Sequence, residues 1–122
     1  MAKQEQEAVR VQGLSQTLDH TPSGAALEAG EIVQIGGDLV GVASSAIPDG
    51  TLGALETEGV FKVSKEDSGP GPTFAAGVEV DWDNTAKEAV AGGTGDFSLG
   101  TTVEAAVATD QSVKTWINKK AF

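Results

Sequence analysis

The sequence predicts a compact all-β domain, similar to a small β-barrel or β-sandwich, and three observations support this prediction. The 122 residues include 16 glycines, which fit many turns rather than long helices. Short apolar segments separated by Gly, Pro and Asp fill residues 29–61, a pattern typical of closely spaced strands. Residues 78–83 alternate between apolar and acidic side chains, as a half-buried strand does. We expect an extended N-terminal arm at residues 1–24 and a β-rich domain at residues 25–122.

The N-terminal segment is polar and carries only a few apolar side chains. Val9 and Val11 alternate with polar neighbours, which favours a strand, whereas Val11, Leu14 and Leu18 share one stripe of a helix. Periodicity leaves this choice open. One interpretation is a disordered tail. The other is an arm that becomes ordered on a partner, for example by adding a strand to the partner's sheet.

The middle of the chain is expected to contain a long loop and then a strand. Residues 62–77 include surface-type side chains such as Lys65 and the sequence SGPGP at 68–72, which cannot form regular structure. In the strand that follows, alternation places Trp82 on the buried face and Asp81 on the polar face.

The C-terminal third is predicted to be a series of turns and strands. Residues 84–90 read as a polar turn, and residues 91–100 as a second glycine-rich loop. The Thr and Val residues of 101–109 favour a strand over a short helix. Residues 113–118 alternate, which predicts a strand with Trp116 on its more exposed face.

One short pattern occurs twice. The sequence Ala-Gly-x-x-Val stands at residues 29–33 and again at residues 76–80. Two copies do not make a repeat fold, but they indicate that the same turn followed by a strand is used twice.

Charge and composition exclude several partners. The formal net charge of −10 disfavours nucleic acid, whose phosphates require clustered Lys and Arg, and it disfavours an anionic membrane surface. The chain has no cysteine, so disulfides, thiol catalysis and thiolate metal sites are excluded. The first residues do not form a signal peptide, and no apolar run is long enough to span a bilayer. The ends of the chain are the least acidic parts and are therefore the easiest places for copies or partners to meet.

No catalytic or cofactor-binding constellation is evident. The single histidine, His20, lies in the expected arm, so neither a Ser-His-acid triad nor a histidine-based zinc site is predicted. The acidic residues near Asp81 depart from a calcium loop at its sixth and twelfth positions. Glu56 and Glu58 form a carboxylate pair that would suit acid–base chemistry, but such pairs arise by chance in an acidic chain. We expect no catalytic residue, metal or cofactor.

The two tryptophans favour an interface over a sugar platform. In a small domain, one Trp typically anchors the core and an exposed one marks a contact surface. Trp82 fits the first role and Trp116 the second.

Several motifs together resemble a known family. Their order is AG-x-x-V (29–33), VGVA (40–43), PDGT (48–51), EGVF (58–61), a Lys at 65 and AG-x-x-V-x-W-D (76–83). Over about residues 25–118 this order is similar to that of the small capsid decoration, or cement, proteins of tailed bacteriophages. The resemblance implies a β-rich domain on the outside of an icosahedral head that bridges subunits of the major capsid protein. It also implies assembly as trimers, or in some members dimers, with capsid contacts made by N-terminal arms.

The main hypothesis is therefore a structural protein, not an enzyme, that is made in the host cytoplasm and binds the outer surface of the virion head. The residues expected to contact the capsid are Val9, Val11, Leu14 and Leu18, and those expected between copies are Trp116, Pro70 and Pro72. The alternatives are a carbohydrate-binding β module on a virion surface and, less favoured, a small hydrolase that uses paired carboxylates.

Overall fold

The computed structural model describes residues 7–12, 16–37, 39–65 and 73–119, and in these residues it contains ten strands and no helix. The prediction of an all-β domain is confirmed. In chain order the strands are β1 (Ala8–Gln12), β2 (Thr17–His20), β3 (Ile32–Gly36), β4 (Leu39–Ala43), β5 (Gly53–Glu56), β6 (Val60–Ser64), β7 (Glu79–Asp83), β8 (Glu88–Ala91), β9 (Phe97–Thr102) and β10 (Ser112–Ile117). Across these residues there is accordingly no helix that could cross a membrane.

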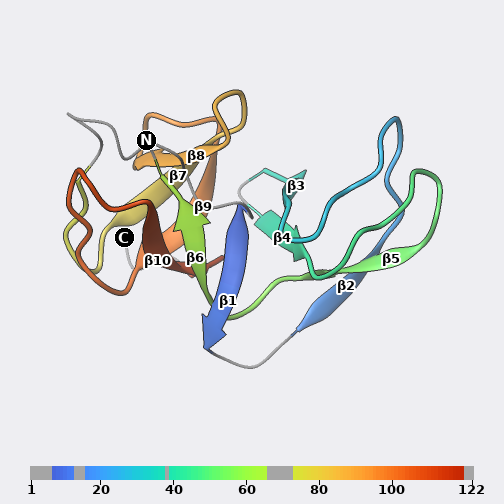
Figure 1. Cartoon of the computed structure of the whole chain (residues 1–122), viewed down its shortest axis with the longest axis horizontal. Coiled ribbons are helices and arrows are strands. Elements are labelled where there is room, and N and C mark those ends of the chain that lie inside the picture. The colour runs from blue at the N-terminus through green and yellow to red at the C-terminus, as the bar shows by residue number, and fades with distance from the viewer. Residues whose placement is uncertain (1–6, 13–15, 38, 66–72, 120–122) are drawn as a thin grey trace.

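The strands form two antiparallel sheets. A six-stranded sheet has the order β1-β6-β10-β9-β7-β8, and a four-stranded sheet has the order β2-β5-β4-β3. The four-stranded sheet extends to one side of the six-stranded sheet, with β2 and β5 farthest from it (Figure 1).

The N-terminal segment contributes a strand to each sheet. β1 pairs with β6, and its first residue, Ala8, is buried in the core. β2 pairs with β5 along its whole length. The segment thus forms strands rather than a helix at Val9, Val11 and Leu18. A boundary at residue 24 between arm and domain stays a prediction.

The apolar core is divided between the sheets. The larger cluster lies in and beside the six-stranded sheet and includes Trp82, which is completely buried as predicted. Val40 and Val42 of β4 also belong to this cluster, so the four-stranded sheet is anchored to it. A smaller cluster of Ala43, Ile47 and Leu55 lies within the four-stranded sheet. This second core is small because its side chains are few and short.

The pattern that occurs twice in the sequence also occurs twice in the structure. A single-residue bridge at Leu27 or Phe74 precedes a turn that ends at Gly30 or Gly77 and leads into β3 or β7. Gly30 and Gly77 have φ values of 82° and 78°, a left-handed conformation that glycine adopts without a steric penalty.

Three expectations for the C-terminal third are wrong. The polar turn expected at 84–90 contains the start of β8, which begins at Glu88. The segment expected to be a loop at 91–100 contains the start of β9, and the strand expected at 101–109 ends at residue 102. Residues 103–109 are turns with one bridge, from Ala106 to Phe74. β9 was missed because all six of its residues are buried, so it shows no alternation.

Two charged side chains expected at the surface are buried. The Asp81 carboxylate accepts hydrogen bonds from the backbone N–H groups of Gly93 (2.9 Å) and Gly95 (3.2 Å), so it fixes the loop between β8 and β9. The Lys65 ammonium donates to the carbonyls of Asp110 (2.9 Å) and Ala108 (3.3 Å). For the Lys65 ammonium and for Oδ2 of Asp81, these hydrogen bonds replace water.

Polar contacts also connect the two sheets. Arg10 of β1 donates hydrogen bonds to the Glu56 carboxylate of β5 and to the Glu58 carbonyl, and it stacks on the Phe61 ring. The Asn118 amide binds both the N–H and the carbonyl of Val40. These contacts fix the position of the four-stranded sheet where the apolar core alone is thin.

Candidate interaction surfaces

The outer face of the six-stranded sheet is defined by the register of its strands. Lys62 of β6 lies directly opposite Lys114 of β10 on one side and Val9 of β1 on the other. Residues directly opposite each other in an antiparallel pair point to the same face. The flanking residues Phe61 and Val63 are buried, so Lys62, Lys114 and Val9 point away from the core.

The next row on this face contains Trp116. It lies opposite Val60 of β6, and 42% of its surface is exposed, as the alternation of residues 113–118 predicted. Val103 lies nearby, because its N–H donates to the carbonyl of Lys114 (3.1 Å), and it too is exposed. A large aromatic ring beside an exposed valine is the kind of surface that is enriched at protein interfaces.

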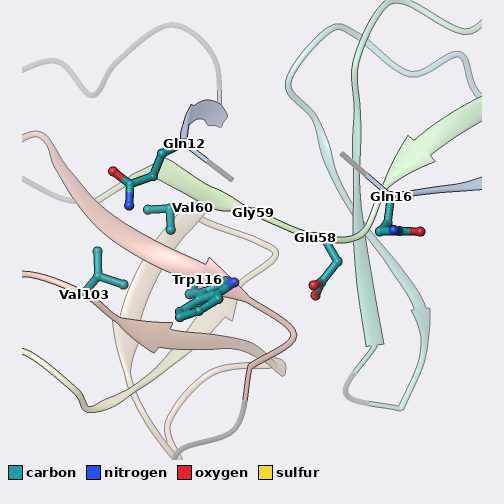
Figure 2. A pocket seen from close by; sticks show the side chains of 7 residues that line it. All are labelled: Gln12, Gln16, Glu58, Gly59, Val60, Val103 and Trp116. Atoms are coloured by element: carbon teal, nitrogen blue, oxygen red, sulfur yellow. The ribbon is translucent and has the colours of Figure 1, made fainter. Parts of the chain in front are cut away.

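A groove runs from this face toward the four-stranded sheet (Figure 2). Its volume is about 360 Å³, and Trp116, Val60 and Val103 lie at one end, with Glu58 and Gln16 at the other. The residues that line it are Gln12, Gln16, Glu58, Gly59, Val60, Val103 and Trp116. Gln12 lies beside Val60 at the apolar end, whereas the Glu58 carboxylate and the Gln16 amide lie at the other end (Figure 2). The groove therefore suits an extended side chain of a partner.

One cation lies over the tryptophan ring, and another lies on the same face of β10. The Lys119 ammonium lies 5.0 Å from the centre of the Trp116 ring, a cation–π geometry. The Lys114 ammonium is 3.1 Å from the Glu104 carboxylate in an exposed ion pair. We use the name outer patch for the residues Lys62, Val103, Lys114, Trp116 and Lys119.

The residues expected to contact the capsid do not form one cluster. Val9 and Val11 are on β1 at the edge of the six-stranded sheet, with exposed fractions of 38% and 37%. Leu18 is on β2 at the edge of the other sheet and is 46% exposed. Each is therefore available to a partner. Leu14, and the inter-copy candidates Pro70 and Pro72, lie outside the described residues.

The geometry offers little support for the alternatives. A sugar platform built from both tryptophans would need both rings exposed, and Trp82 is completely buried. The Glu56 carboxylate, half of the pair considered for hydrolysis, is held by Arg10 at 2.8 Å from Nε. Within the described part of the chain, no group of three or more His, Asp or Glu residues is placed to hold a metal ion.

Sequence analysis identified Trp116 but not the lysines around it. The alternation that placed Trp116 on the exposed face also places Lys114 there, so this signal was available. The pairing of Lys62 with Lys114 depends on strands that are far apart in the sequence, and no local pattern reports it.

Comparison with known proteins gives one family. A family model described as phage cement protein matches residues 11–117, which is more than half of the chain. No curated protein and no solved structure matches the chain.

Proposed function

Because the chain belongs to the phage cement protein family, a family of structural capsid proteins, we propose that it binds the outer surface of the mature head and stabilises contacts between major capsid protein subunits. The family match across residues 11–117 carries this proposal. In the proposal the protein is made in the host cytoplasm, assembles on the virion as a homotrimer and needs no cofactor.

The proposed mechanism is linkage between binding and stability. A protein that binds only the mature lattice stabilises it by RT ln(1 + [L]/Kd), which is about 2.7 kcal/mol per site at a concentration one hundred times Kd. A head offers many equivalent sites, so modest contacts add up to a large total. No catalytic step is needed.

We assign the capsid contact to the exposed apolar residues near the N-terminus, Val9, Val11, Leu14 and Leu18. The exposure of Val9, Val11 and Leu18 on the edge strands β1 and β2 supports this assignment, because edge strands can pair with a partner's sheet. Trp116, Pro70 and Pro72 are assigned to contacts between copies, and the exposure of Trp116 supports its part.

The test is co-sedimentation with expanded heads that lack the protein. We expect saturable binding with a fixed number of copies per head, and a rise in the temperature at which the heads open. Failure of the wild-type protein to bind heads would overturn the proposed function.

Point variants then test the assigned residues. Deletion of residues 1–20 is unsuitable, because it would remove β1 from the six-stranded sheet and β2 from the four-stranded sheet. The triple variant Val9→Ser, Val11→Ser, Leu18→Ser should lose about tenfold or more in affinity for heads. Val107→Ser is the matched control, since Val107 is 58% exposed on a turn outside β1 and β2. Equal binding by the triple variant and the control would refute the assignment of the residues but not the function.

A further inference from the structure

Charge is divided unevenly between the two sheets. Residues 16–58, which hold all strands of the four-stranded sheet, contain seven of the 18 acidic residues and none of the eight Lys and Arg residues. Every cation of the chain therefore lies outside that sheet and its loops. The chain as a whole is acidic, so this separation leaves the cations concentrated on the remaining surface.

Three of the cations lie on the outer patch. Lys62 and Lys114 lie opposite each other on neighbouring strands, and Lys119 covers the Trp116 ring. Glu104 faces this group through its ion pair with Lys114, Asp110 lines the same hollow as Lys62 and Lys114, and Glu58 lines the groove beside Trp116. The patch thus combines three ammonium groups with an exposed aromatic ring and an exposed valine. Aromatic rings of this kind supply much of the binding energy at interfaces.

The four-stranded sheet has the opposite character. Asp19, Glu28 and Asp49 are exposed on its strands and loops. Large apolar side chains are exposed on the same strands and loops, Ile35 at 37%, Leu39 at 41% and Leu52 at 65%. This sheet also extends away from the rest of the molecule, so it can reach a neighbour (Figure 1).

We propose that the outer patch of one copy binds the four-stranded sheet of a second copy of this chain. The two surfaces are complementary in charge, and each adds exposed apolar side chains that the contact would bury. Since the surfaces differ, the contact is head-to-tail, and every copy can use both surfaces at once. A head-to-tail contact closes into a ring when the rotation between copies permits, which is how the proposed trimer would form.

This inference rests on the part of the proposed function in which copies associate, and it is tested on the protein alone. Sedimentation equilibrium of the full chain should show self-association in about 0.01 M NaCl, with a weaker association in about 1 M NaCl. This change in salt shortens the Debye length from about 30 Å to about 3 Å.

Charge reversal identifies the surfaces. The basic-to-acidic variant, Lys62→Glu with Lys114→Glu, should raise the self-association Kd about tenfold or more, and so should the acidic-to-basic variant, Asp19→Lys with Glu28→Lys. An equal mixture of the two should associate again, because each then offers the other a complementary surface. Lys87→Glu, which makes the same type of charge change in the turn between β7 and β8, should change Kd by less than about twofold.

Three outcomes would overturn the proposal. They are a wild-type protein that stays monomeric in low salt, a mixture that does not regain association, and a basic-to-acidic variant that binds wild type more tightly than wild type binds itself. The last result would indicate that two outer patches meet face to face. Restored association in the mixture also shows that both variants are folded. Binding to heads is measured separately. If the protein does not bind heads, the proposed function is refuted, but the proposed contact between copies is not.

Discussion

Asn118 connects the two sheets, and replacing it with alanine is expected to destabilise the fold by about 3 kcal/mol. Its Nδ2 donates hydrogen bonds to the carbonyls of Val40 (2.9 Å) and Thr57 (2.9 Å), and its Oδ1 accepts one from the N–H of Val40 (3.0 Å). Val40 is completely buried in the larger core cluster. The Val40 backbone groups that Asn118 satisfies are therefore shielded, so water can replace their hydrogen bonds only in part.

The magnitude follows from the number of hydrogen bonds and from the backbone conformation. Each of the three contributes about 1 kcal/mol net, and a buried N–H left without a partner costs about 1–3 kcal/mol. Asn118 has a φ of 61°, a left-handed conformation that costs an alanine about 1 kcal/mol. Partial hydration of the two carbonyls offsets some of this loss, so the expected range is about 2–4 kcal/mol. For a domain of this size that corresponds to a fall in Tm of roughly 10 °C.

Urea and thermal unfolding followed by circular dichroism measure the effect. Asn84→Ala is the matched control, because the Asn84 side chain accepts a hydrogen bond only in an exposed turn, from Lys87, and its loss should stay within about 0.5 kcal/mol. Asn118→Gly keeps the left-handed conformation accessible, so its difference from Asn118→Ala isolates the backbone cost. A loss for Asn118→Ala no larger than that of the control would refute the role of this side chain as a connection between the sheets.

Two further substitutions test the packing inside the four-stranded sheet and the ion pair between the two sheets. A Cβ added at Gly41 would lie 2.8 Å from the Leu55 Cβ, so Gly41→Ala should lower the free energy of unfolding by about 1–3 kcal/mol. Gly36 has open space around it, so the control Gly36→Ala should change this free energy by less than about 0.5 kcal/mol. Equal urea midpoints for the two variants would contradict this prediction. Arg10→Met removes the cation that holds the Glu56 carboxylate and should lower the free energy of unfolding by about 2 kcal/mol. In a double-mutant cycle, adding Glu56→Gln should restore part of this loss. Strictly additive losses would show that the pair does not interact.

The strands that the sequence predicted well are those with one exposed face. β10 alternates, so its position in the chain and the exposure of Trp116 could be predicted from local pattern alone. β9 is buried throughout and consists largely of small residues. Because it shows no alternation, its start was predicted to be part of a glycine-rich loop. The sequence TTVEAAVAT has the propensity of a strand, yet after Thr102 the chain turns, because propensity is weaker than tertiary context.

The candidate surfaces were harder to predict from the sequence than the strands, because they depend on tertiary structure. Alternation placed Lys114 and Trp116 on one face, but pairing with β6 was needed to bring Lys62 beside them. The expectation for Lys65 was also wrong. A lysine in a polar segment was expected at the surface, but the Lys65 side chain is buried and donates hydrogen bonds to backbone carbonyls. The contacts assigned to Leu14, Pro70 and Pro72 stay predictions.

The thinness of the second core gives assembly a physical role in stability. The four-stranded sheet has only the small cluster of Ala43, Ile47 and Leu55 as its own core, and it leaves Leu39 and Leu52 exposed. Full burial of a leucine contributes about 1.5–3 kcal/mol. If a neighbouring copy covers these two side chains, the contact stabilises the sheet as well as joining the copies. A cement protein built in this way would be most stable only when assembled, which couples its own folding to the lattice that it reinforces.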